Sequence, residues 1–218
     1  MDEVGKPPIV ILGGGGHASV LADICLQQGR EIMAVVSPDV ISARSVFRGI
    51  KRLERDTDVL SFAPKTVELV NGIGNIPGSD LRRQLARKFS ELGYRFRNVI
   101  ASSSLVSEFA VIDEGAQVLP GAIINSGAIL GPHSIVNSGA VVEHDCVIEE
   151  YVHVGPNSTI CGGACIGAGS IIGPSAVVAM GLNIGKMTII GAGASVVRSV
   201  GNSKKLIPAH TRTENNKP

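Results

Sequence analysis

An aliphatic side chain recurs at every sixth position through the second half of the sequence. The series begins at Ile100 and runs without a miss to Val196, seventeen positions in all. Four residues after most of these positions stands a small residue, as at Ala116, Ala122 and Ala128, and Gly often precedes it. A six-residue unit of this kind is typical of a parallel β-helix, in which three short strands make one triangular coil. Each coil then takes eighteen residues.

The repeat also explains an unusual composition. The chain of 218 residues has 27 Gly and only 3% aromatic residues. In a β-helix the aliphatic residue fills the interior, the small residue fits at a corner, and Gly gives the corner its backbone freedom. Residues eighteen apart should lie directly above one another at strand spacing, about 4.8 Å. A period of six fits neither a helix nor a heptad, and it argues against a sandwich with accidental spacing.

Strand-like and helix-like segments alternate in the first half of the chain. This order predicts a small Rossmann-like α/β domain. Its expected strands are 8–12, 31–36 and 66–70, and its expected helices are 18–24 and 80–92, the second capped by Ser79. We therefore expect three parts: the α/β domain over 1–98, the β-helix over 99–200 and a polar tail over 201–218.

Three loops at the carboxyl ends of the expected strands form a candidate ligand site, because such sheets bind ligands at that edge. They are 13–17, 37–39 and 72–75. Loop amides at a helix N-terminus suit a phosphate or pyrophosphate. The loop also fits the dinucleotide pattern G-x-G-x-x-A, and Asp39 could bind a ribose. A complete NAD fold would need a longer chain, and a purely structural glycine turn is the other alternative.

Most hexads carry no reactive side chains, but the segment 143–146 contains Glu, His, Asp and Cys. His144 is suited to accept a proton near neutral pH. Asp145, expected near a corner, can orient His144 and favour its protonated form. Eighteen residues after His144 stands Gly162, whose amide is expected one coil above the base. An amide there can stabilise the oxyanion of an acyl-transfer intermediate.

Other readings of the polar residues are weaker. His153 lies half a coil from His144, so it could approach the same spot only through a ligand or across a trimer interface. The alternative is a structural histidine at the surface or an interface. His144, Asp145 and His153 include metal-ligand types, but their spacing matches no tight cluster. Cys146 could be a nucleophile, yet it holds the small inward position of its repeat and is better read as core.

Charge and cysteine content exclude several classes of function. Lys plus Arg number 20 and Asp plus Glu 19, so no net field gathers nucleic acid or an anionic membrane. The four cysteines show no disulfide or C-x-x-C pattern, and the N-terminus lacks the basic start of a signal peptide. No uncharged apolar run reaches the 18 or more residues of a membrane helix. We expect a soluble, cytoplasmic protein without nucleic-acid or membrane partners.

The combination of a glycine-loop domain with a His-Asp centre resembles a known family. The chain is similar over nearly its whole length to bacterial hexapeptide acyltransferases of the sialic acid O-acetyltransferase and PglD type, which acetylate sugars and sugar nucleotides. The matching segments are 13–17, 73–75, 137–145, 190–194 and 207–209. The resemblance implies left-handed coils and a homotrimer with acetyl-CoA as cosubstrate, bound between neighbouring β-helices. It implies no metal.

The resemblance also implies roles for individual residues. His144 would be the base, supported by Asp145, with the Gly162 amide above it. A nucleotide-linked amino sugar would be contacted by Gly15, Gly16, His17, Ser37, Pro38, Asp39, Gly74, Asn75 and Asn137. Acetyl-CoA would meet His153, Gly162, Gly163, Pro174, Gly191 and Ala192.

The expected activity is acetyl-CoA-dependent N-acetylation of a UDP- or GDP-linked 4-amino-4,6-dideoxy sugar. Two alternatives stay open: O-acetylation of a sialic-acid-type sugar, and a non-catalytic β-helix that binds a nucleotide. Members that use UDP often carry paired acids after the second strand, whereas this chain has Ser37-Pro38-Asp39. The sequence therefore leaves the nucleotide and the sugar open.

Overall fold

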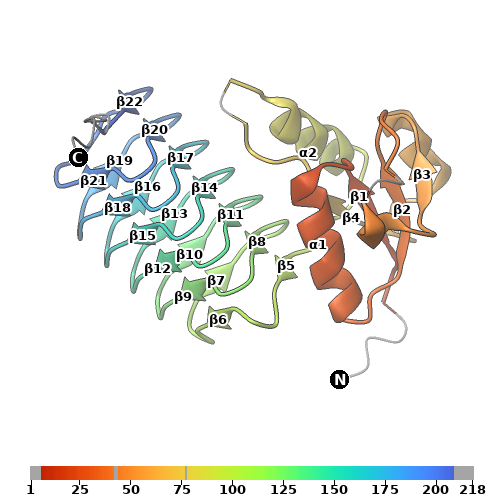
Figure 1. Ribbon diagram of the computed structural model, residues 1–218, viewed down its shortest axis with the longest axis horizontal. Helices are drawn as coiled ribbons and strands as arrows, with labels where there is room; N and C mark the ends of the chain where they lie inside the picture. The colour runs from red at the N-terminus through yellow and green to blue at the C-terminus, as the bar shows by residue number, and fades with distance from the viewer. Residues whose placement is uncertain (1–5, 42–43, 77, 209–218) are drawn as a thin grey trace, which may run out of the picture.

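The computed structural model describes residues 6–41, 44–76 and 78–208. The chain folds into a small α/β domain followed by a long stack of short strands, and the two are joined near residue 98 (Figure 1). Among the described residues, no helix is long and apolar enough to cross a membrane. The last ten residues of the expected tail, 209–218, lie outside the described part of the chain.

The α/β domain is built on a parallel sheet of four strands in the order β3-β2-β1-β4. The three predicted strands are β1, β2 and β4, and a short edge strand, β3, is added between the second and third. The elements are β1 (Ile9–Leu12), α1 (Gly16–Gln27), β2 (Ile32–Val36), η1 (Ser45–Phe47), β3 (Lys51–Leu53), η2 (Asp56–Ser61), β4 (Glu68–Asn71) and α2 (Leu81–Glu91).

Alternate residues of β1 separate the two faces of this sheet. Ile9 and Ile11 pack with α1, whereas Val10 and Leu12 pack with α2. This alternation follows from the two-residue period of a strand, and it explains why β1 is buried on both sides. The expected cap of α2 is displaced: Asp80 is the N-cap residue, and the Ser79 hydroxyl accepts a weak bond from the Leu81 amide at 3.4 Å.

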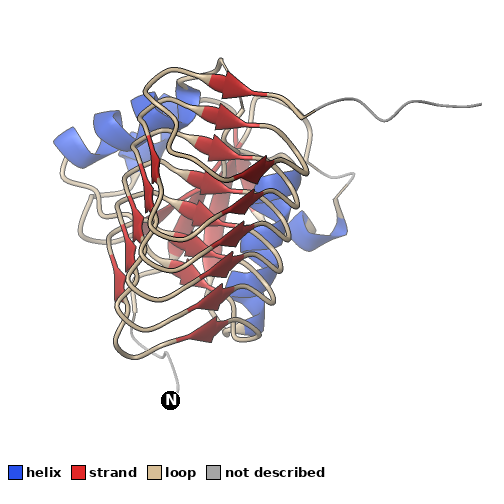
Figure 2. Cartoon of the chain, turned by 90° about the vertical axis from the view of Figure 1, so that its left-hand side faces the viewer, coloured by secondary structure: helices blue, strands red, loops and turns tan. Residues whose placement is uncertain are grey.

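The second half forms the predicted left-handed parallel β-helix of hexapeptide repeats, with three flat faces (Figure 2). The seven-stranded face contains β5 (Val99–Ile100), β8 (Gln117–Val118), β11 (Ile135–Val136), β14 (His153–Val154), β17 (Ile171–Ile172), β20 (Ile189–Ile190) and β22 (Lys205–Leu206). The six-stranded face contains β6 (Leu105–Val106), β9 (Ile123–Ile124), β12 (Val141–Val142), β15 (Thr159–Ile160), β18 (Val177–Val178) and β21 (Ser195–Val196). The five-stranded face contains β7 (Val111–Ile112), β10 (Ile129–Leu130), β13 (Val147–Ile148), β16 (Cys165–Ile166) and β19 (Asn183–Ile184).

Residues eighteen apart are paired neighbours, as the hexad rule predicts. Val141 pairs with Thr159 and Val142 with Ile160, and the same register holds from coil to coil. The repeated aliphatic residues from Val118 to Val196 are buried in one core. Lys205–Leu206 joins this stack by pairing with β20, so the coils extend into the segment expected to be a tail.

The corners explain the small residues and the glycines. The small residues that follow the corners are buried, and the glycines before them have positive φ, for example +74° at Gly127 and +69° at Gly163. This conformation is energetically unfavourable for residues other than glycine, and least so for Asp and Asn. Asp145 holds it at φ 58°, as do other non-glycine corner residues such as His133 and Asn157.

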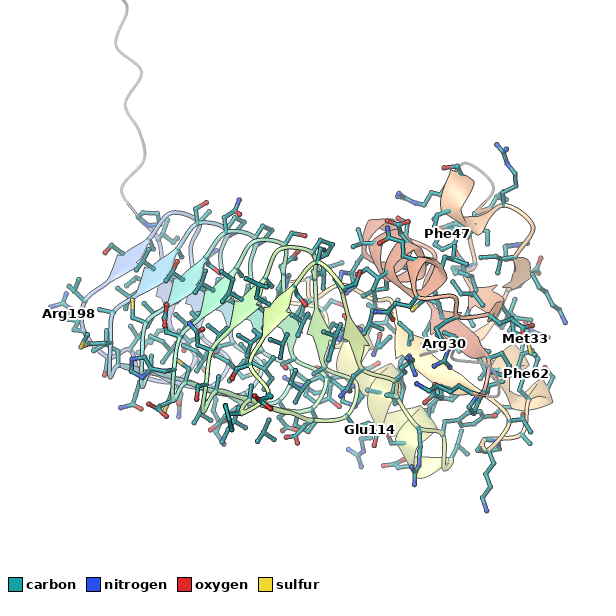
Figure 3. All side chains as sticks on the ribbon, turned by 90° about the horizontal axis from the view of Figure 1, so that it is seen from below. Arg30, Met33, Phe47, Phe62, Glu114 and Arg198 are labelled. Atoms are coloured by element: carbon teal, nitrogen blue, oxygen red, sulfur yellow. The ribbon has the colours of Figure 1, made fainter. Side chains whose placement is uncertain are left out.

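The α/β domain packs on the first coils and along the seven-stranded face. Val99, Leu119 and Ile135 belong to the same core as α1. Seen from below, Arg30 of the α/β domain and Glu114 of the first coils both lie near the junction of the two halves (Figure 3). The contact continues along the corner between the five- and seven-stranded faces, where the His133 and Tyr151 rings stack at 5.1 Å.

Candidate functional site

His144 and Asp145 form a hydrogen-bonded pair at the corner between the six- and five-stranded faces. The chain leaves β12 at Val142 and enters β13 at Val147. The left-handed backbone of Asp145 lets its carboxylate turn back to its neighbour, so Nδ1 of His144 lies 2.9 Å from Oδ2 of Asp145. Both side chains are exposed in the single chain, at 65% and 72%. The corner therefore overcomes the opposite directions that adjacent strand residues would take.

Gly162 lies directly above the His144 ring. The amide of Gly163 donates to the carbonyl of His144 at 2.9 Å, which fixes the two corners on one another. A Cβ built on Gly162 would lie only 2.5 Å from Nε2 of His144. Among the described residues, the Gly162 amide has no hydrogen-bond acceptor. The corner thus brings together a ring nitrogen not used by Asp145 and a free backbone donor.

Cys146 is a core residue next to this corner. Its side chain is fully buried, and its Sγ lies 3.2 Å from the carbonyl oxygen of Cys161. Burial raises the pKa of the Cys146 thiol, which disfavours the thiolate that a nucleophile needs. The interpretation of Cys146 as core is consistent with this position.

The glycine loop opens onto a pocket of about 690 Å³ at the carboxyl edge of the α/β sheet. All three predicted loops line it, which brings together Gly15, Gly16, His17, Ser37, Pro38, Asp39 and Gly74. Gly15 is the N-cap of α1, and no side chain caps this end of the helix. The free amides of the first turn favour an anion.

Two further arginines shape this pocket. The guanidinium of Arg52 donates to the carbonyl oxygens of Ser37 and Pro38 at 3.2 and 3.0 Å, which holds the second loop. Among the described residues that line the pocket, Arg44 is the one cation. Its Nη2 lies 3.9 Å from the place where a Gly16 Cβ would be. No periodicity or motif in the sequence indicates Arg44.

Asn75 and Asn137 do not line this pocket. Nδ2 of Asn75 donates to the carbonyl of Tyr151 at 3.1 Å, which fastens the third loop to the β-helix. Nδ2 of Asn137 contacts Nε2 of His153 at 3.0 Å. Asn137 is thus paired with His153 on the seven-stranded face, whereas His144 lies at the opposite corner.

Arg82 is a buried cation at the junction of the two halves. It is 4% exposed, and its guanidinium donates to the carbonyl oxygens of Asn71, Ile73 and His133 at 2.8, 2.7 and 3.1 Å. Burial lowers the pKa of Arg82 to about 9, so it stays charged at neutral pH. A sequence signal existed, because Arg82 falls on the apolar stripe of α2 with Leu85, Ala86 and Phe89.

Three histidines surround Arg82 and are kept neutral. Burial, and after it the charge of Arg82, lowers the pKa of His17, His133 and His153 to about 4. For His17 the bond to Gln117 opposes this shift without cancelling it. This part of the junction therefore combines the charge of Arg82 with neutral imidazoles.

The residues expected to meet acetyl-CoA lie at two corners and on one face. Gly162 and Gly163 stand with His144 at one edge of the six-stranded face. Pro174, Gly191 and Ala192 are stacked at its other edge, where the amide of Gly193 donates to the carbonyl of Pro174 at 2.8 Å. His153 starts β14 on the seven-stranded face. A single chain does not bring these groups into one pocket.

Among the described residues, no group of three or more potential metal ligands is present.

Two family descriptions match the chain. The PglD N-terminal domain matches residues 8–89, and the bacterial transferase hexapeptide (six repeats) matches residues 145–179.

Solved structures match over nearly the whole length. A histidine-to-asparagine mutant of perosamine N-acetyltransferase from Caulobacter crescentus, in complex with CoA and GDP-perosamine, is 33% identical. The match covers 96% of this chain and 99% of that chain with a TM-score of 0.83. The acetyltransferase domain of PglB from Neisseria gonorrhoeae FA1090, in complex with acetyl coenzyme A, is 26% identical over 92% of this chain and 96% of that one, with a TM-score of 0.84. WeeI from Acinetobacter baumannii AYE, at 24% identity and a TM-score of 0.79 over 92% and 96% of the two chains, shares the fold.

Proposed function

Because the chain belongs to the PglD-type family of hexapeptide-repeat acyltransferases, we propose that it acetylates the amino group of a nucleotide-linked amino sugar with acetyl-CoA. The observation that carries the proposal is the corner where His144, Asp145 and Gly162 meet beside a free backbone amide. The relatives bound to CoA, acetyl coenzyme A and GDP-perosamine support the choice of both substrates.

The proposed chemistry is direct transfer without an enzyme-bound intermediate. With the Nδ1 proton donated to Asp145, Nε2 of His144 is the basic nitrogen. The sugar amine attacks the thioester carbonyl, and Nε2 takes the proton that the amine loses. The Gly162 amide stabilises the oxyanion as the new C–N bond forms. The C–S bond then breaks, and the thiolate of CoA leaves and takes up a proton.

The pocket of the α/β domain is the proposed site for the nucleotide. Its α1 amides at Gly15 and Gly16 and the guanidinium of Arg44 suit a diphosphate. Asp39 lines the same pocket, where a carboxylate can accept from a ribose hydroxyl or a base. The amino sugar would then extend from the diphosphate out of the pocket.

The base and the nucleotide pocket of one chain lie on different sides of the prism. The α/β domain packs on the seven-stranded face, whereas His144 stands at the corner between the other two faces. We propose that a neighbouring copy supplies the missing part in a homotrimer, with acetyl-CoA between β-helices. Flat faces with exposed Val111, Ile129 and Val177 suit such packing. Sedimentation equilibrium tests this, and a stable monomer contradicts it.

A direct assay tests the activity. UDP-, GDP- and dTDP-linked 4-amino sugars are incubated with acetyl-CoA, and free thiol release is followed. We expect one nucleotide amino sugar to be preferred by far. Preference for free sialic acid would favour O-acetylation instead. Calorimetric titration with acetyl-CoA separates both from a scaffold, which should give no heat of binding.

A further inference from the structure

Gln117 connects the glycine loop to the β-helix through both ends of its side-chain amide. It lies on β8 and is only 1% exposed. Its Oε1 is 2.7 Å from Nε2 of His17, one hundred residues earlier in the chain. Its Nε2 donates to the backbone carbonyl of Asn71 at 2.8 Å. No role for Gln117 follows from the hexad pattern.

The Asn71 carbonyl determines which way the Gln117 amide points. A carbonyl oxygen can only accept, so the amide nitrogen of Gln117 must face it. The Asn71 carbonyl also accepts from the charged Arg82 at 2.8 Å, which fixes its position. Turning the Gln117 amide over would set two oxygens against each other in a buried site, at the cost of an unsatisfied pair. The Oε1 atom of Gln117 therefore faces His17.

This orientation in turn determines the proton on His17. Because Oε1 of Gln117 can only accept, Nε2 of His17 must carry the hydrogen. A neutral imidazole has one N–H, so its Nδ1 is then an acceptor. His17 is held neutral by burial and by the charge of Arg82, which lower its pKa to about 4.

The second nitrogen of His17 is open to the nucleotide pocket. His17 lines this pocket with the glycine loop and Gly74. Among the described residues, the buried ring nitrogens without a partner are Nδ1 of His133 and Nδ1 of His153. Nδ1 of His17 is not one of them, and no described residue makes a hydrogen bond with it. The Nδ1 lone pair is therefore accessible, on a residue that lines the pocket.

We propose that Gln117 is a positioning residue that fixes His17 as a hydrogen-bond acceptor, so that the pocket selects ligands that present an O–H or N–H group beside the diphosphate. Resting on the proposed function, this assigns His17 to a hydroxyl or amino group of the sugar nucleotide and not to a phosphate oxygen. A phosphate oxygen has no hydrogen to donate and would face a lone pair.

The tautomer is tested first, without any ligand. The protein is labelled with 15N-histidine, and long-range 1H–15N correlation spectra are recorded at neutral pH for the wild type and for the Gln117→Glu and Gln117→Met variants. We expect wild-type His17 as the Nε2–H tautomer. Gln117→Glu should hold a protonated ring, with hydrogen on both nitrogens, and Gln117→Met should show a mixture of tautomers. A wild-type Nδ1–H tautomer overturns the inference, whatever the enzymatic activity.

Ligand binding tests the selection. Calorimetry with GDP-perosamine against GDP, and with a UDP-linked 4-amino sugar against UDP, gives the preference for the sugar-bearing ligand. In Gln117→Glu this preference should fall by about tenfold or more, because the Nδ1 acceptor becomes a donor. An equal loss for sugar nucleotide and free diphosphate indicates a merely structural role and overturns the proposal.

Gln28→Glu is the matched control. Nε2 of Gln28 donates to the carbonyl of Ile100 at 2.6 Å, so this variant also loses an amide bond between the two halves but does not touch His17. It should leave the ligand preference and the His17 tautomer unchanged. If no nucleotide amino sugar is acetylated, the proposed function fails while the tautomer result stands.

Discussion

Nε2 of His144 occupies the space that any side chain at Gly162 would need, since a Cβ there would approach it to 2.5 Å. Two residues eighteen positions apart thus form one site: the first supplies the ring and the second supplies room and a free amide. The relationship exists because coils stack in register, and it makes the site sensitive to a single methyl group.

The Gly162→Ala substitution should inactivate the enzyme without unfolding it. Gly162 does not have positive φ, so the backbone accepts alanine, but the methyl group must displace the exposed His144 ring. We expect kcat to fall by about 10- to 1000-fold, since a misplaced base and a blocked oxyanion donor both raise the barrier. Thiol release measures kcat, and a thermal melt checks the fold. Gly201→Ala is the control, because open space surrounds that glycine. Wild-type kcat in Gly162→Ala contradicts the site.

Replacing His144 with alanine removes the proposed base. Turnover should fall by roughly 10² to 10⁴. Because the ring is largely exposed in the single chain, the melting temperature should change little. Acetyl-CoA binding, followed by calorimetry, should persist. Turnover close to that of the wild type would exclude His144 as the base.

Arg44→Ala tests the missed cation of the nucleotide pocket. Arg44 carries a positive charge at the pocket wall and lies beside the glycine loop. Loss of a charge-assisted bond to a diphosphate should raise KM for the sugar nucleotide by about tenfold or more, with KM for acetyl-CoA unchanged. Arg48→Ala, outside this pocket, serves as the control. Equal KM values in wild type and Arg44→Ala would move the diphosphate elsewhere.

The neutral histidines predict a loss of stability in acid. His17, His133 and His153 have folded-state pKa values of about 4, below the ordinary 6.5. Between these values the unfolded chain binds protons that the folded chain does not. Stability is therefore full above pH 6.5 and falls as the pH drops towards 4, by up to about 1.4 kcal/mol per pH unit for each histidine.

Urea unfolding at several pH values measures this slope. The His133→Asn variant should show a shallower slope, because the unfolded chain then takes up about one proton fewer. Asparagine tolerates the left-handed backbone at this position, so the variant should fold. A slope that is the same in both proteins would show that His133 does not contribute.

Arg82→Lys should weaken the junction between the two halves. Lysine keeps the charge but cannot reach the three carbonyl oxygens of Asn71, Ile73 and His133 with the geometry of a guanidinium. We expect the free energy of unfolding to fall by about 3 kcal/mol, because buried acceptors lose their donors. Calorimetric melting compares it with Arg87→Lys, whose side chain pairs with Glu91 on the surface. Equal melting temperatures would contradict the role of Arg82.

Much of the fold could be predicted because its pattern is local and repeated. One aliphatic residue in every six points into the interior. Each coil repeats the register of the coil before it, as the pairing of Val142 with Ile160 shows. The α/β domain was predicted from strands that alternate with helices. The edge strand β3 was not predicted, because Lys51-Arg52-Leu53 is short and mostly polar.

The site was only partly predictable. The His144 corner was found by counting eighteen residues, which is a property of the coil. Arg44 and Gln117 were missed because they act on loops far away in the sequence. Arg82 was missed although its place on the apolar stripe of α2 was a signal. Asn137, expected to contact the amino sugar, is bonded to His153, a contact that the sequence pattern did not indicate. Contacts between the α/β domain and the β-helix produce no repeating pattern in the sequence.

The pairing of every strand with the one a full turn away limits how such a chain can change length. An insertion can loop out of a corner and leave the stack intact. A deletion inside the stack has no such remedy: losing a number of residues that is not a multiple of six would turn later interior side chains outward, and losing one or two hexads between His144 and Gly162 would place them on different corners. Shortened descendants of this protein should therefore differ by whole hexads.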